Sequence, residues 1–171
     1  MAKLFSTTLF AALFIGFTAT AQQDKSKRAS PPAKVTETTK KGVTITIDYG
    51  QPSLKGRKIG TDIVPYGKIW RTGANEATVF EINKDVKIEG QALPAGKYSL
   101  YTLPNEKEWT VIFNKSWNQW GTNYSESNDQ LRITVKPEKS ESFQEKLTFD
   151  ISKSGEVSLE WGDTEVEFEV K

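Results

Sequence analysis

Apolar side chains alternate with polar ones over most of the chain, and this period of two constrains the fold more than any other feature. Between Val43 and Tyr49, every second residue is apolar, and the residues between them are Thr44, Thr46 and Asp48. Such alternation is typical of a strand with one buried face and one wet face. The same pattern recurs in seven further runs, at residues 78–82, 86–88, 109–113, 131–135, 147–151, 157–161 and 166–170.

Turn residues separate these runs, and no window of about a dozen residues has the 3.6-residue period of an amphipathic helix. We therefore predict an all-β fold, an antiparallel β-sandwich that is jelly-roll-like, with one long irregular loop segment at residues 52–73. For the C-terminal strands we predict a hairpin with a two-residue turn at Gly162 and Asp163. This hairpin would set Leu159 opposite Val166.

In such a hairpin, glutamates would face one another on the outer side, with Glu160 opposite Glu165 and Glu156 opposite Glu169. Like charges in direct opposition are unfavourable. Two interpretations follow: a calcium or cationic-ligand site, or a solvated sheet face whose charges discourage aggregation. We favour the second.

The first 21 residues follow a different pattern. Lys3 precedes an apolar stretch at residues 9–17, and Ala-Thr-Ala ends the segment at residue 21, as in a cleavable secretory signal peptide. An uncleaved membrane anchor is the alternative, although the apolar stretch is short for a span. We expect a signal peptide at 1–21, a flexible leader at 22–33 and a single β-sandwich domain at 34–171. The product is expected to be exported, either periplasmic or extracellular, with no membrane span.

The chain has no His and no Cys. Nucleophilic catalysis by Ser-His or Cys-His pairs, thiolate or imidazole metal sites, and disulfides are therefore excluded. With 23 basic and 22 acidic residues, the overall charge gives no support to nucleic-acid binding. We expect no cofactor and no metal, so carboxylates, Lys, Arg, Tyr, hydroxyls and amides remain for chemistry.

The densest polar cluster lies at residues 67–78 and contains Trp70, Arg71, Asn75 and Glu76. Arg71 is suited to hold a carboxylate or phosphate in a bidentate fork, Asn75 and Glu76 to bond hydroxyls, and Trp70 to stack on a sugar face. The alternative is that Arg71 and Glu76 pair with each other, or bond loop carbonyls, and hold the loop shut.

Further candidates come from three other segments. Lys97 and Tyr101 would join the cluster if their face of the strand turns toward it. Trp120 lies in an aromatic-bearing polar stretch that either caps the sandwich or offers a stacking surface. Asp129 is a potential acidic partner of Glu76, as is Asp62, should the site be a pair of carboxylates like that of a glycosidase.

Several of these segments carry a family resemblance. They read GKIWRTGANEAT (67–78), LPAGKYSLYTLP (93–104), EWTVIFNK (108–115), QWGTNY (119–124) and DQLRITVKP (129–137). In them the chain resembles the DUF2911 proteins, exported bacterial proteins of unknown function that are common in Bacteroidetes. The resemblance implies an exported all-β domain whose characteristic motif includes Trp70, Arg71, Gly73, Asn75 and Glu76. It implies no reaction, substrate or catalytic residue.

Three functions remain open. The first is a binding module for a small polar or glycan-like ligand in a pocket formed by the loop from Trp70 to Glu76. The second is a structural or interaction domain that meets a protein partner of the envelope. The third is a carboxylate-dependent hydrolase, which needs two acids facing one cleft, one of them with a raised pKa. We favour binding, and assign no catalytic residue.

Overall fold

The computed structural model describes residues 24–171, so the expected signal peptide lies outside the described residues. Within this range, no helix has the length and apolar character needed to cross a membrane. The elements follow in the order η1 (Lys25–Lys27), β1 (Pro32–Thr38), β2 (Thr44–Gly50), β3 (Ile59–Gly60), β4 (Ile63–Pro65), β5 (Thr78–Ile82), β6 (Val86–Ile88), β7 (Gln91–Leu93), β8 (Gly96–Pro104), β9 (Trp109–Asn114), η2 (Glu126–Asn128), β10 (Asp129–Val135), β11 (Pro137–Ile151) and β12 (Glu156–Glu169).

Six strands form one antiparallel sheet in the order β1-β2-β5-β8-β9-β10. The alternation in β2 explains its place in this sheet: Ile45 and Ile47 are fully buried, whereas Thr44 and Thr46, which precede them, are partly exposed. One face of the sheet therefore supplies the apolar core.

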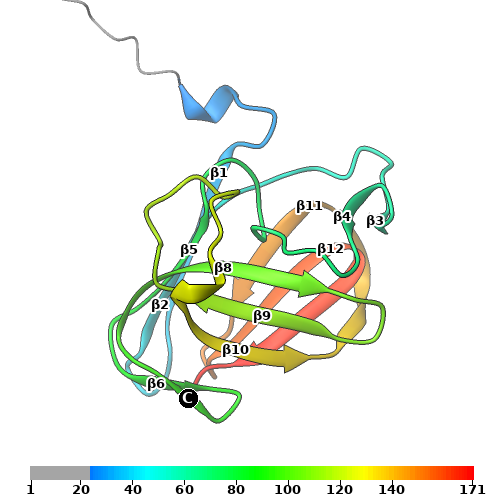
Figure 1. Cartoon of the computed structure of the whole chain (residues 1–171). Helices are drawn as coiled ribbons and strands as arrows, with labels where there is room; N and C mark the ends of the chain where they lie inside the picture. The colour runs from blue at the N-terminus through cyan, green and yellow to red at the C-terminus, as the bar shows by residue number, and fades with distance from the viewer. Residues whose placement is uncertain (1–23) are drawn as a thin grey trace, which may run out of the picture.

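The long strands β11 and β12 pair with each other and cover the apolar face of this sheet (Figure 1). Phe168 of β12 shows the contact between the layers, since its ring lies 6.1 Å from Phe80 and 5.8 Å from Phe113 in the six-stranded sheet. These aromatic side chains are buried and meet at tilted or edge-on angles, as aromatic pairs prefer. The predicted all-β antiparallel sandwich is thus confirmed.

The predicted C-terminal hairpin is wrong. β12 continues through Gly162 and Asp163 as one strand, and Leu159 pairs with Phe149 of β11 rather than with Val166. Gly162 has a φ of 64°, and the β11–β12 register shifts around its partner Gln144. A bulge here, instead of a turn, shifts the alternation of β12 by one residue. The buried side chains are those of residues 157, 159 and 161 before the bulge and those of residues 166, 168 and 170 after it, so both halves keep their apolar side chains in the core.

The outer face of the β11–β12 pair remains acidic. Glu138 lies directly opposite Glu165, and burial together with the charges of Glu160, Glu141 and Glu138 raises the pKa of Glu165. Among residues 24–171 there is no group of three or more His, Cys, Asp or Glu side chains that could hold a metal ion. The described residues therefore give no support to the calcium interpretation of this face.

Residues 51–69, called the lobe below, form the irregular segment between β2 and β5. It contains the short parallel pair β3–β4 and lies beside the ends of β11 and β12 (Figure 1). Backbone hydrogen bonds from Leu54 N to Glu145 O and from Leu147 N to Pro52 O attach it to β11. The lobe is thereby held against one end of the sandwich.

The N-terminal residues approach the same end of the molecule. β1 begins at Pro32, inside the range expected to be a leader, and Gln51 N donates to Pro31 O at 2.8 Å. Asp24 caps the single turn of η1, because its side chain accepts hydrogen bonds from Ser26. This turn places two basic residues, Lys25 and Arg28, next to the loop that precedes β5.

Candidate functional site

Residues 70–78, called the motif loop below, are fixed by close backbone packing. A Cβ atom added to Gly50 would lie 2.1 Å from Ala74 O, and one added to Gly73 would lie 2.5 Å from Thr78 Oγ1. Thr72 and Asn75 both have positive φ, of 51° and 66°. The chain thus turns sharply between them, and the side chains before and after the turn line two different cavities.

The first, called the Arg71 cavity, lies between the lobe and the sandwich and has a volume of about 300 Å³. This is at the lower end of the range for small-molecule sites. It is lined by Ser30, Pro52, Arg57, Ile63, Val64, Pro65, Lys68, Ile69, Trp70, Arg71, Gly73, Ala74 and Trp161.

Two indole rings form a wall of this cavity. Trp70 stacks on Trp161 with ring centroids 5.4 Å apart and planes 13° apart, and it meets Trp109 edge-on at 6.3 Å. The backbone of Trp70 is fixed by reciprocal hydrogen bonds with Thr102, at 2.8 and 2.9 Å. Trp161 is fully buried and donates its indole N–H to Glu145 O at 3.3 Å. The wall is therefore preorganised by both layers of the sandwich.

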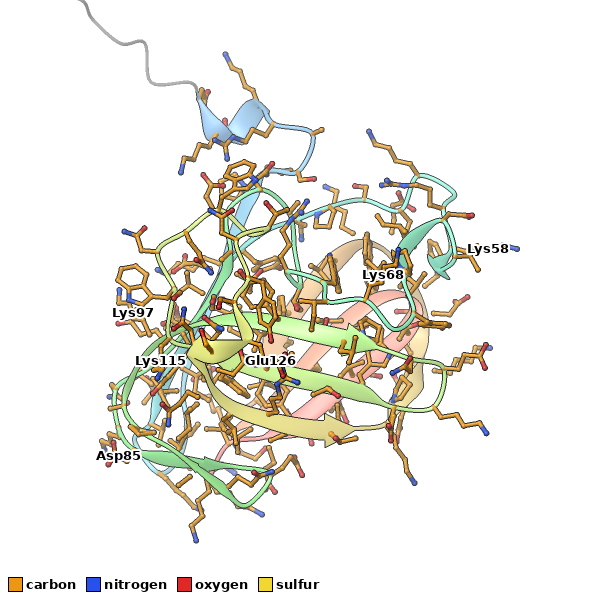
Figure 2. All side chains as sticks on the ribbon, viewed as in Figure 1. Lys58, Lys68, Asp85, Lys97, Lys115 and Glu126 are labelled. Atoms are coloured by element: carbon orange, nitrogen blue, oxygen red, sulfur yellow. The ribbon has the colours of Figure 1, made fainter. Side chains whose placement is uncertain are left out.

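Three cations, Arg57, Lys68 and Arg71, line the Arg71 cavity, and no carboxylate of the described residues does. Arg57 donates to the carbonyls of Leu54 and Ser53, both at 2.8 Å. Among residues 24–171, Arg71 forms no salt bridge, and its buried Nε has no hydrogen-bond acceptor. The Lys68 side chain, labelled in Figure 2, also has no salt bridge to a described residue.

The segment QWG at 119–121 positions Arg71. A Cβ atom at Gly121 would lie 2.3 Å from Arg71 Cδ, so this close approach requires glycine. Backbone hydrogen bonds join the two segments, from Ala77 N to Gln119 O and from Gly121 N to Asn75 O, each at 3.0 Å. The aliphatic part of Arg71 thus lies directly on the backbone of Gly121.

Tyr101 lies near Arg71 but is inaccessible. Its side chain is buried, and its hydroxyl accepts a hydrogen bond from Gln119 Nε2 at 3.1 Å. Burial raises the pKa of the Tyr101 phenol, while the hydrogen bond from Gln119 and the charge of Arg71 oppose that rise. Tyr101 therefore belongs to the packing behind Arg71 and does not line either cavity.

The second cavity, called the Glu76 cavity, has a volume of about 190 Å³ and lies on the N-terminal side of the motif loop. It is lined by Lys25, Arg28, Pro32, Ala33, Asp48, Tyr49, Gly50, Asn75, Glu76, Ala77 and Val79. Asn75 Nδ2 donates to Ser30 O at 3.0 Å. Asn75 and Glu76 therefore face the N-terminal segment rather than the Arg71 cavity.

Glu76 is held by two cations. Lys25 Nζ lies 2.9 Å from Oε1, and Arg28 Nη1 lies 2.8 Å from Oε2 and 3.1 Å from Oε1. The hydrogen bond from Lys25, with a smaller effect of Arg28, lowers the pKa of Glu76 to about 2, although partial burial opposes this. The predicted alternative of an Arg71–Glu76 pair is wrong, because these partners of Glu76 come from the N-terminal segment.

The remaining candidates lie outside the linings of both cavities. Lys97 pairs with Glu81 at 3.1 Å and lies over the ring of Trp117 at 5.1 Å, well separated from Lys68 in Figure 2. Trp120 is 48% exposed and is bridged through its backbone to Glu76. The structure thus does not bring Lys97 or Trp120 to Arg71 in one cavity.

Asp129 is the centre of a separate network. It accepts hydrogen bonds from Asn114 at 2.7 Å, from the Tyr124 hydroxyl at 2.7 Å and from Arg132 at 2.8 Å. Burial, followed by the hydrogen bond to Asp129, raises the pKa of Tyr124 to about 12. This network fixes the loop between β9 and β10. The polar groups of the network already have hydrogen-bond partners within the chain.

The carboxylate pairs expected of a hydrolase are not set up for that chemistry. A general acid needs a raised pKa, whereas the pKa of Glu76 is lowered to about 2. Asp62 accepts from the backbone N–H of Lys58 at 3.0 Å, which makes it a turn residue of the lobe. Neither Asp62 nor Asp129 lines a cavity with Glu76.

Five residues that the fold brings to the two cavities were not among those expected from the sequence. Arg57, Lys68 and Trp161 complete the Arg71 cavity, and Lys25 and Arg28 complete the Glu76 cavity. The number of basic residues in the segment 52–73 was a usable signal for the first two. Nothing in the period-two pattern distinguishes Trp161 from other core residues of its strand.

Comparisons with known proteins give one match. A family model described as "Protein of unknown function (DUF2911)" matches residues 30–170, nearly the whole chain. No curated protein and no solved structure matches it.

Proposed function

Because the chain belongs to the DUF2911 family, whose function is unknown, we propose a function from its own geometry: an exported binding module for a small polar or glycan-like ligand. The site is the Arg71 cavity, on one side of the motif loop. The proposal of export rests on the signal-peptide pattern of residues 1–21, and cell fractionation tests it by locating the mature chain.

One observation carries the proposal of binding: Arg71, which has no salt bridge and no acceptor for its buried Nε among residues 24–171, lies beside a stacked pair of indoles in one cavity. A buried donor without an acceptor costs about 1–3 kcal/mol, so such groups call for an explanation other than stability. An aromatic face next to free donors is suited to a ring that bears polar substituents.

Backbone conformation around the cavity supports the same proposal. Val64, which lines it, has a φ of 54°, and Thr72, next to Arg71, has a φ of 51°. Both residues are β-branched, for which the left-handed region is strongly unfavourable. Strained positions of this kind gather at ligand sites, where the surrounding structure over-determines them.

A thermal-shift screen tests the proposal. Neutral and acidic mono- and oligosaccharides and cell-envelope fragments are tested against the wild-type chain and the Arg71→Ala variant. We expect at least one compound to raise the melting temperature of the wild type and to have a smaller effect on the variant. Melting curves that no compound shifts would contradict the proposal.

A further inference from the structure

We infer that the ligand of the Arg71 cavity is a small oxyanion, a molecule whose carboxylate or phosphoryl group contacts Arg71 and Lys68. This inference rests on the proposed function and specifies its ligand class. Its basis is the charge of the cavity lining: the described charged residues that line the Arg71 cavity are all basic, whereas the Glu76 cavity is lined by both basic and acidic residues.

Elsewhere in the described chain, some cations are placed beside carboxylates. Lys34 lies 3.2 Å from Asp48, Lys97 lies 3.1 Å from Glu81, and Arg132 lies 2.7 Å from Asp129. The chain as a whole has nearly equal numbers of basic and acidic residues, 23 and 22. The charged residues that line the Arg71 cavity are all cations among residues 24–171, which is a local segregation of charge and not a result of overall composition.

Such a segregation is unfavourable in the absence of an anion. Like charges that share a partly enclosed space repel one another more strongly than they do in water, because the local dielectric constant is lower. A bound oxyanion attracts these cations, so the electrostatic energy in the cavity becomes favourable. It also supplies acceptors to guanidinium and ammonium groups, whose hydrogen bonds to charged acceptors are about twice as strong as neutral ones.

The cation at the centre of the site is placed rigidly. Trp70, the residue before Arg71, is fixed by its backbone hydrogen bonds to Thr102, and the Arg71 side chain lies on Gly121. A side chain held in this way loses little further entropy on binding. Lys68, by contrast, is exposed and makes no salt bridge to a described residue, so it is free to follow an anion into the cavity.

The rest of the lining restricts the body of the ligand. Ile63, Val64, Ile69 and the Trp70–Trp161 wall present apolar surface, while a volume of about 300 Å³ limits the size. An inorganic ion would leave this surface unused. A single sugar ring or similar small body that carries the oxyanion makes use of both parts of the cavity.

Isothermal titration calorimetry of residues 22–171 tests the inference with four probes: glucose, glucuronate, glucose 6-phosphate and inorganic phosphate. Glucose and the two acidic sugars share a ring and differ in the oxyanion. We expect glucuronate or glucose 6-phosphate to bind at least tenfold more tightly than glucose, and which of them binds distinguishes a carboxylate from a phosphoryl group. The affinity should fall as sodium chloride is raised.

Two variants test whether Arg71 and Lys68 bind the acidic sugar, and a third variant serves as a matched control. Arg71→Gln should weaken binding of the acidic sugar by tenfold or more, and Lys68→Gln should weaken it several-fold. Lys97→Gln, which removes a lysine outside the cavity, should leave the affinity unchanged. Because Lys68 is exposed, its variant should melt like the wild type, and so tests the inference even if Arg71→Gln folds poorly.

The outcomes separate the inference from the proposed function. Equal affinities for glucose and the acidic sugars, both weakened by Arg71→Gln, would overturn the oxyanion inference and leave the binding function in place. A lack of binding by all four probes, together with a thermal-shift screen in which no compound is active, would overturn both. Tight binding of acidic sugars that neither Arg71→Gln nor Lys68→Gln weakens would also overturn the inference.

Discussion

Arg71 and Glu76 lie five positions apart in one loop, yet their surroundings are opposite. Glu76 is held by Lys25 and Arg28, whereas Arg71 has no ionic partner among residues 24–171. The turn at Gly73 and Ala74 sends the two side chains to different cavities, so they do not meet. In our proposal, the loop uses one charge to attach the N-terminal segment and keeps the other for a ligand.

The largest expected effect on stability comes from a substitution that displaces the motif loop, which separates the two cavities. In Gly50→Ala, the new Cβ would lie 2.1 Å from the backbone oxygen of Ala74, which cannot move without shifting the motif loop. We expect the free energy of unfolding to fall by about 2–3 kcal/mol, a cost typical of overpacking. Urea denaturation followed by circular dichroism measures it.

Gly56→Ala is the control for this variant. Gly56 also has a positive φ, of 74°, but a Cβ there would have no neighbour within 4 Å. It should lose only about 1 kcal/mol, the cost of a left-handed alanine. Equal losses in the two variants would show that backbone packing at Gly50 does not hold the motif loop.

Replacing Arg71 by Met tests whether its charge stabilises the fold. Met keeps much of the side-chain length and removes the buried donor that has no acceptor. We therefore expect the free energy of unfolding to stay the same or rise by about 1 kcal/mol, while ligand binding is lost. A loss of stability of more than about 1 kcal/mol would mark Arg71 as a structural residue and contradict the comparison.

Glu76→Gln should have the opposite effects to Arg71→Met, because it should reduce stability and leave ligand binding unchanged. Its pairing with Lys25 and Arg28 is partly exposed, so we expect a loss of only about 0.2–1 kcal/mol at pH 7 and no change in ligand affinity. The pKa of Glu76 is lowered to about 2 in the folded chain. Its contribution is thus fully present above about pH 4.5, the ordinary value, and decreases as the pH falls toward 2.

Melting temperatures of wild type and Glu76→Gln, measured at pH 7 and at pH 3, test this dependence. The difference between the two proteins should be smaller at pH 3. A constant difference would mean that the carboxylate charge does not attach the N-terminal segment.

The smallest expected effect concerns a third kind of charged region, the acidic face of β11 and β12. Since burial and neighbouring carboxylates raise the pKa of Glu165, its ionised form is disfavoured in the folded chain. Glu165→Gln should therefore stabilise the fold by a few tenths of a kcal/mol at pH 7, and this gain should vanish at low pH, where the carboxyl group is protonated. Glu106→Gln, on an exposed turn, is the control and should change nothing.

The sheet strands were predictable because burial on one face imposes alternation on the sequence. The runs around Ile47, Phe80 and Val111 correspond to β2, β5 and β9. The path of the chain after Trp161 was not predictable in the same way. Gly162 fits both a turn and a bulge, and only its long-range pairing with Gln144 of β11 decides between them.

The site was predictable in its composition but not in its geometry. Residues of the motif loop line both cavities. The separation of the two cavities depends on positive φ values at Thr72 and Asn75. Asn adopts this region comparatively often, but Thr gives no such signal in a sequence. The pairing of Glu76 depends on Lys25 and Arg28, about fifty residues away in a polar segment without periodicity.

The stacked pair of Trp70 and Trp161 also gives the protein an optical property. Two indoles 5.4 Å apart are close enough to couple their electronic transitions, and the emission of an indole depends on the polarity of its surroundings. Since both rings line the Arg71 cavity, a ligand that enters it changes the polarity next to them. Occupancy of the cavity can therefore be followed in solution without a label, by the light that its own wall absorbs and emits.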